Sequence, residues 1–302
     1  TLDFDFFELL DSVTIARSRK HIEKYYDTAE IGKFPERRKP ISRRPQLTDL
    51  DSAINYNEIY EQLILLTLCI YTPSNYIFPS KMQKYIDLTH NKGDNLTQTG
   101  REEGIRRLMS INLLKRLESS VNSFQLTLER IKSLIDSTIK AIDDFEKNGA
   151  ADIDMYEVSD SEFDMDDGNT EYFTVGKKVK IELADMDYKS WRVGLKADAE
   201  ILELLTLMIA EITPEHDSKE LLKLVSEKIE NPINPGNKKV LIFSAFSDTA
   251  EYLYDNVSVY IKKKYGLDTA VITGSIDGKT TIKGFRATLN NVLTCFSPIS
   301  KG

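Results

Sequence analysis

One stretch of the sequence has residue types suited to phosphate chemistry. It reads Gly-Ser-Ile-Asp-Gly-Lys-Thr from Gly274 to Thr280 and follows a short apolar run, 269–273. In a phosphate-binding loop, glycine N–H groups wrap the phosphates, a lysine neutralises their charge, and Ser or Thr holds magnesium. That loop has four residues between its glycines, whereas this stretch has three. We therefore expect a glycine-rich turn after a strand, with a phosphate loop as the alternative.

The sequence offers no pattern for metal binding or nucleophilic catalysis. His21, His90 and His216 fall in different segments, and none has a second His or Cys at ligand spacing. Cys69 and Cys295 lie in apolar contexts, so we expect neither a disulfide scaffold nor a zinc ribbon, and a reducing cytoplasm fits best. We assign no catalytic residue, metal ligand or cofactor to this chain.

Groups of basic residues are better suited to binding nucleic acid. Lys and Arg side chains contact backbone phosphates without reading the base sequence. The groups are Arg17, Arg19 and Lys20, then Arg37, Arg38, Arg43 and Arg44, and finally Arg106, Arg107, Lys115 and Arg116. Taken alone, each group is more often a solvated surface.

The net charge conceals this basic character. The chain has 302 residues, with 40 Lys and Arg against 48 Asp and Glu, which gives a net charge of −8. Nine of the acidic residues lie between Asp152 and Glu171, where no Lys or Arg occurs, so the remainder carries +1. From Arg17 to Arg44 the balance is +6. We expect the acidic strip to be a disordered loop, with a solvated surface as the simpler alternative.

Helices are expected to carry most of these residues. The apolar periodicity predicts helices over 5–26, 55–71, 79–88, 101–148, 196–213 and 217–229, and the prolines predict an extended connector over 33–48. In the strongest pattern, a and d positions from Leu114 to Phe145 are apolar except Thr138. This helix forms either an antiparallel hairpin with 196–213 or a coiled coil with another chain. The facing residues of 196–213 would be Ile201, Leu204, Leu205, Met208 and Ile212.

The pattern changes after Pro232 and Pro235. Val240–Phe243 is a continuous apolar run that predicts a strand buried on both faces. A helix over 247–264 and a strand over 269–273 follow, which predicts a parallel βαβ unit. A short strand is also expected over 178–183. The longest apolar stretch is far shorter than the roughly 20 residues of a transmembrane helix, so we expect no membrane partner.

Several segments are similar to one protein family. Residues 239–253 read KVLIFSAFSDTAEYL, Gly274-Ser275 ends the next predicted strand, and residues 113–120 read LLKRLESS. Shorter similarities cover 9–20, 217–224 and 293–300. In this order they resemble the Swi/Snf-like bacterial helicases of superfamily 2. Residues 239–253 are similar to helicase motif IV of the second RecA-like lobe, and 113–120 to an element of the helical insertion in one bacterial branch.

The resemblance implies part of an ATP-dependent nucleic-acid helicase or translocase, with ATP and magnesium as cofactors of the parent protein. It places phosphate contacts at Ser244, Phe246, Gly274 and Ser275, and the charge pattern adds Arg17, Arg19, Lys115 and Arg116. The chain lacks the family's nucleotide-binding loop and arginine-bearing motif VI, and it begins with Thr. We therefore expect an interior fragment that is inactive on ATP by itself. Its partners would be the missing lobes and nucleic acid, with DNA favoured over RNA.

The expected fold is mostly α with a C-terminal α/β portion, comprising a long helical hairpin and part of a RecA-like parallel sheet. The expected domains are the end of the first lobe and connector (1–48), a helical insertion (49–149), the acidic loop (150–176), returning helices (177–230) and part of the second lobe (236–302). An alternative hypothesis is a non-enzymatic helical scaffold that binds a protein partner through the 114–145 seam. An independent phosphate-loop NTPase is a third.

Overall fold

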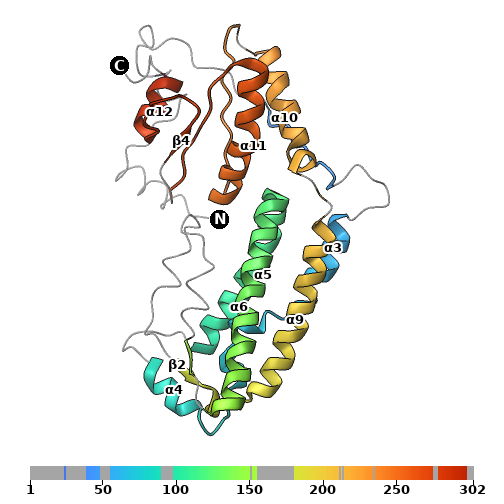
Figure 1. The fold of residues 1–302 in the computed structure, drawn as a ribbon, viewed down its shortest axis with the longest axis vertical. Coiled ribbons are helices and arrows are strands. Elements are labelled where there is room, and N and C mark those ends of the chain that lie inside the picture. Colours follow the sequence, from blue (N-terminus) through green and yellow to red (C-terminus); the bar gives the residue numbers. More distant parts are fainter. Residues whose placement is uncertain are drawn as a thin grey trace. The chain divides into compact units, whose positions relative to one another are not determined.

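The computed structural model describes residues 24, 39–47, 55–89, 98–149, 152–154, 180–210, 212, 214–233, 235–274 and 278–297. The chain divides into two units, Thr1–Arg44 and Pro45–Gly302. All elements named below belong to the second unit (Figure 1). The predicted helix over 5–26 lies outside the described residues apart from Lys24, and the five-part domain division stays a prediction.

The second unit is mostly helical, which confirms this part of the expected fold class. Its α-helices are α3 (Tyr56–Leu63), α4 (Met82–Thr89), α5 (Gln98–Ser119), α6 (Val121–Asn148), α9 (Tyr188–Ile209), α10 (Pro214–Glu230), α11 (Ser247–Tyr265) and α12 (Leu289–Phe296). Short 3-10 helices are η1 (Cys69–Tyr71), η2 (Pro73–Tyr76) and η3 (Leu183–Asp185), and strands are β1 (Asp152–Asp154), β2 (Lys180–Glu182), β3 (Ala270–Val271) and β4 (Lys279–Thr280). Within the described ranges, every helix is too short or too polar to cross a bilayer.

The helix predicted over 101–148 is in fact two helices. α5 and α6 are separated by Ser120, whose backbone is extended at φ −165° and ψ 151°. The Ser120 hydroxyl accepts a hydrogen bond from the N–H of Ser123 at 3.0 Å and so caps α6. Gly149 ends α6 in the left-handed conformation, which glycine adopts without strain. The heptad pattern continues across Ser120, which is why periodicity alone predicted a single helix.

The core of the unit is the packing of α6 against α9 (Figure 1). The fully buried residues of the two helices are Phe124, Leu128, Ile131, Ile135 and Ile142 from α6, and Trp191, Leu195, Leu202 and Leu205 from α9. Phe145 near the end of α6 lies 5.3 Å from Tyr188 at the start of α9, so the helices run antiparallel. The antiparallel hairpin is therefore confirmed, and its seam is buried within this chain.

The buried face of α9 matches the predicted one except at Leu204. Leu205 is buried, and Ile201, Met208 and Ile212 pack half-buried against the same core. Leu204 is 44% exposed, whereas Leu202 and Ile209 are buried in addition. The helix also begins earlier than expected, because Asp187 caps it by accepting the N–H of Ser190 at 3.1 Å. The sequence pattern missed Asp198, which also lies on the buried face, because such patterns assign a charged residue to solvent.

Asp198 is fully buried and fastens α9 to the chain between α3 and η1. Its carboxylate accepts the N–H groups of Thr67 at 2.7 Å and Cys69 at 3.0 Å, and also the Thr67 hydroxyl at 3.0 Å. Leu68 between them has φ 50°, a strained left-handed conformation that these contacts hold in place. Two turns earlier in α9, the buried Trp191 donates its indole N–H to the Cys69 carbonyl at 3.0 Å and so fastens the same loop.

We expect Asp198→Ala to lower the free energy of unfolding by about 3 kcal/mol, because the buried N–H of Cys69 and the part-buried N–H of Thr67 lose their acceptor. Urea unfolding followed by helical circular dichroism measures this. Glu200→Ala is the matched control, since it removes an exposed carboxylate from the same helix. Equal effects of the two substitutions would show that Asp198 does not fasten the loop.

The strand pairing differs from the parallel sheet that we predicted. Both strand pairs in the described part of the chain are antiparallel: β1 pairs with β2, and β3 pairs with β4. The strand predicted over 178–183 is β2, and its partner β1 comes from the acidic strip. That three-residue piece is therefore a strand rather than loop, and residues 155–179 lie outside the described residues.

Val240–Phe243, predicted as a doubly buried strand, has no strand partner among the described residues, and Phe243 is 84% exposed. Its apolar composition suits an interior strand, but a strand forms only where a neighbour satisfies its backbone groups. The helix and second strand of the unit match α11 and β3. α11 packs on α10 around a small core of Val225, Ile229, Val257 and Ile261.

Asp185 in η3 links this element to α4. Its carboxylate accepts hydrogen bonds from Lys84 and Tyr85, both at 2.8 Å, and lies 3.3 Å from Lys81. The hydrogen bond from Lys84, followed by that from Tyr85, lowers the pKa of Asp185 to about 2. The ionised carboxylate is therefore the form that stabilises this contact.

Because the folded pKa is lowered, the stabilisation by Asp185 is complete above its ordinary pKa of 3.8 and fades as the pH falls toward 2. We expect wild type to exceed Asp185→Asn in unfolding free energy by about 2 kcal/mol at neutral pH. The difference should shrink below pH 4 in urea titrations of both proteins. A difference that is constant with pH would contradict the assigned role.

Candidate functional site: the polar contact of α5 and α6 with α11

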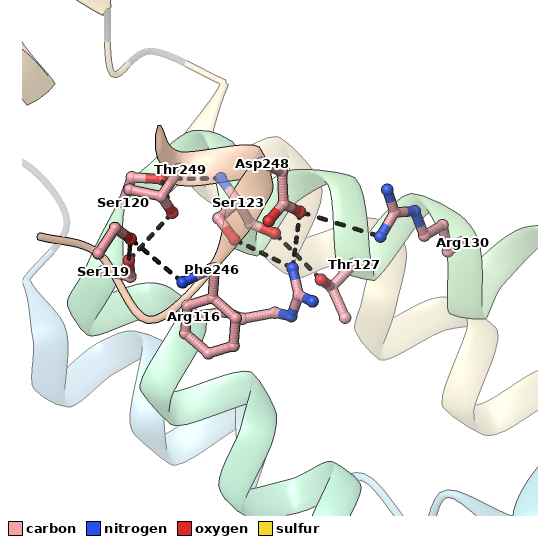
Figure 2. A network of polar contacts seen from close by, with 10 residues as sticks. Arg116, Ser119, Ser120, Ser123, Thr127, Arg130, Phe246, Asp248 and Thr249 are labelled. Atoms are coloured by element: carbon pink, nitrogen blue, oxygen red, sulfur yellow. Dashed lines mark hydrogen bonds and ion pairs between the residues drawn. The ribbon is translucent and has the colours of Figure 1, made fainter. Parts of the chain in front are cut away.

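Arg116 of α5 is the buried centre of this contact (Figure 2). Its Nη1 donates to Oδ2 of Asp248 at 2.7 Å and to Oγ of Ser123 at 3.0 Å. Its guanidinium lies over the Phe246 ring, 4.6 Å from the centroid. The Arg116 side chain is only 1% exposed, so it faces a carboxylate inside the protein. Asp248 is thus a partner of Arg116 in this structure, and the phosphate contact predicted for Arg116 stays a prediction.

Hydroxyl groups extend the contact on one side of Arg116, as Figure 2 shows. The Ser119 hydroxyl donates to Oγ1 of Thr249 at 3.0 Å, and Ser120 lies 3.2 Å from the same atom. Ser119 also lies 3.5 Å from the hydroxyl of Ser244, which accepts the N–H of Phe246. Small polar groups therefore connect the break between α5 and α6 with the start of α11.

The local sequence explains why Arg116 is buried. Met109, Leu113 and Arg116 follow one another at spacings of four and three, which places them on one face of α5. Met109 and Leu113 are buried in the large core, so the same face carries Arg116 inward. This spacing was a usable signal, although grouping Arg116 with the adjacent Lys115 concealed it.

Asp248 stands in the first turn of α11, and no side chain caps the N-terminus of that helix. A carboxylate there is favoured by the partial positive charge of the helix N-terminus. Asp248 thus meets positive charge from its own helix, from Arg116 and from Arg130 of α6, whose Nη1 lies 3.9 Å away. Asp248 belongs to the segment 239–253 that resembles helicase motif IV. Its partners Arg116 and Arg130 are more than 100 residues away in sequence, so the sequence alone does not reveal the contact.

The structure brings three of the predicted site residues together: Arg116, Phe246 and Ser244. Lys115 is exposed on α5 beside this cluster, and Ser244 is also exposed. Gly274 is exposed after β3 and makes none of these contacts. Arg17, Arg19 and Ser275 lie outside the described residues. The residues missed from sequence are Ser119, Ser120, Ser123, Arg130, Asp248 and Thr249.

The glycine-rich stretch has a structural role in β4. Lys279 lies 2.8 Å from Glu251, and this hydrogen bond raises the pKa of Lys279. Thr280 donates its hydroxyl to the Thr269 carbonyl at 2.9 Å. A Cβ on Gly278 would lie 2.0 Å from the Ala287 oxygen, so the close approach of the chain requires glycine. Lys279 and Thr280 are in a strand, whereas a phosphate loop leads into a helix.

No family model, curated protein or solved structure matches this chain. The helicase resemblance therefore rests on the residues quoted above and on their order. Among the described residues, no group of His, Cys, Asp or Glu is arranged to hold a metal ion.

We expect a double-mutant cycle of Arg116→Ala and Asp248→Ala to give a coupling energy of about 1–2 kcal/mol in urea unfolding. Asp248→Ala should be the more damaging single change, because it takes the carboxylate away from a guanidinium that is only 1% exposed. Arg116→Ala leaves a carboxylate that is 13% exposed and still lies 3.9 Å from Arg130. Lys115→Ala, on the exposed side of the same helix, should change stability by less than about 0.5 kcal/mol. Additive effects would mean that the ion pair contributes nothing to the contact.

Proposed function

We propose that this chain is part of an ATP-dependent nucleic-acid helicase or translocase of the Swi/Snf-like type, and that it contacts the nucleic-acid backbone. One observation carries the proposal. The two segments with the most extensive helicase resemblance, 113–120 and 239–253, adjoin through Arg116 and Asp248, which are 132 residues apart in sequence. Two segments that resemble helicase elements only by chance need not lie next to each other in the folded chain. Two segments that belong to one functional surface must do so.

The surroundings of the contact suit a phosphate backbone. Lys115 is exposed on α5, Arg130 is partly exposed on α6, and Ser244 presents an exposed hydroxyl. Cations and hydroxyls of this kind bind phosphate oxygens without base selectivity. In the parent protein, Val240–Phe243 would be the first strand of the RecA-like parallel sheet, and ATP and magnesium would bind outside the residues described above.

The scaffold hypothesis receives less support. Its docking surface was the 114–145 seam, and the residues of that seam are buried or half-buried, chiefly against α9. A protein partner would have to displace α9 before it could use this surface.

Binding of fluorescent duplex DNA, measured by anisotropy over a range of NaCl concentrations, tests the proposal. We expect the logarithm of the association constant to fall linearly with the logarithm of salt concentration, by about 0.9 per phosphate contacted. Lys115→Ala should reduce this slope by about 1, because it removes one phosphate contact. Lys140→Ala, an exposed lysine on α6, is the control.

An RNA duplex of the same sequence, titrated in parallel, distinguishes the two nucleic acids. Absence of salt-dependent binding at low salt would reject the proposed function. If Lys115→Ala and Lys140→Ala reduce the salt dependence of binding equally, the nucleic acid does not bind specifically at the surface around Lys115.

A further inference from the structure

The contact between α11 and the α5–α6 break lies outside both apolar cores. Every buried residue of the large core comes from Leu47 to Ile209, and the small core consists of Val225, Ile229, Val257 and Ile261. The groups that meet between them are polar, apart from the Phe246 ring on Arg116. α11 can therefore move away from α5 and α6 without opening either core.

The ion pair at the centre is monodentate. Oδ2 of Asp248 faces both Arg116 and Arg130, whereas Oδ1 has no hydrogen-bond partner in the described part of the chain. A two-point arginine–carboxylate pair is considerably stronger than a contact through one oxygen. Asp248 remains 13% exposed and Arg130 is 45% exposed, so ions from solution reach the edge of the contact. We therefore expect the ion pair between Arg116 and Asp248 to be weak enough to break and re-form while the protein stays folded.

The surface beneath Asp248 has the composition of a phosphate site. Two arginines from different helices converge on it, and the hydroxyls of Ser119, Ser120 and Ser123 lie around Arg116. Arginine pairs with a phosphate through two parallel hydrogen bonds, which Asp248 does not provide in its present position. A backbone phosphate is therefore a strong competitor for the place that Asp248 occupies.

We propose that the Arg116–Asp248 contact is an autoinhibitory latch, in which Asp248 covers arginines that bind a nucleic-acid phosphate once α11 moves away. This inference rests on the proposed function. It also accounts for the position of Arg116, which is buried when the latch is closed and faces the backbone when the latch is open. Asp248 is thus an internal substitute for the phosphate.

The first test measures the latch without nucleic acid. Spectroscopic labels on Ser133→Cys in α6 and Val259→Cys in α11 report the separation of the two helices, because both positions are exposed. Cys295→Ser removes the exposed native thiol, whereas burial raises the pKa of the Cys69 thiol to about 12 and keeps it unlabelled. Distance distributions are recorded for each variant.

We expect Asp248→Asn to populate longer distances and Asp255→Asn to leave them unchanged. Asp255 is the matched control, since it is an exposed carboxylate on the same helix and its substitution changes the charge equally. Exchanging the charges, Arg116→Asp with Asp248→Arg, should restore short distances. If Asp248→Asn and Asp255→Asn have the same distance distribution, there is no latch.

The second test measures binding of the same duplex DNA. We expect Asp248→Asn to bind about tenfold more tightly than wild type, and Asp255→Asn to show only the small gain due to charge. Adding Arg116→Gln to Asp248→Asn should remove the gain. If wild type binds DNA but Asp248→Asn binds it no more tightly than Asp255→Asn does, the latch is rejected and the proposed function stands. If no variant binds DNA at low salt, both proposals fail.

Discussion

The packing of α6 against α9 determines where the other elements of the helical body lie. A continuous row of buried Leu and Ile side chains fixes the antiparallel register of the two helices. α5 joins the same core through Met109, Leu113 and Leu117, so its orientation is set by apolar burial rather than by its own polar contacts. Arg116 shares that face, and its burial follows from the packing of its apolar neighbours.

Sequence patterns predicted this arrangement only in part. The heptads of α6 were readable because apolar residues recur regularly, but the break at Ser120 was not, because a single serine fits a helix as well as a cap. On α9 the missed buried position is Asp198, because its carboxylate accepts the backbone N–H groups of Thr67 and Cys69, which no periodicity reveals. Long-range polar contacts are therefore the main source of the errors.

The candidate site could likewise be predicted only in part, because its central contact is a long-range polar one. Lys115, Ser244 and Phe246 could be chosen from charge and resemblance, because both depend on local sequence. The pairing of Arg116 with Asp248 required knowledge of which helices meet. The polar character of that meeting point contrasts with the apolar α6–α9 interface, and dissolved salt weakens contacts between charges more than contacts between apolar side chains.

The exposed run Val240–Phe243 has a consequence for the behaviour of the chain in solution. In the part of the chain that the structure describes, no strand pairs with this extended apolar segment. Unpaired backbone groups of this kind can pair with another chain, which is how edge strands nucleate aggregation. Lys238 and Lys239 directly precede the run, and charges in such flanking positions oppose the stacking of identical segments. We therefore expect replacement of these two lysines to favour self-association of the chain at high concentration.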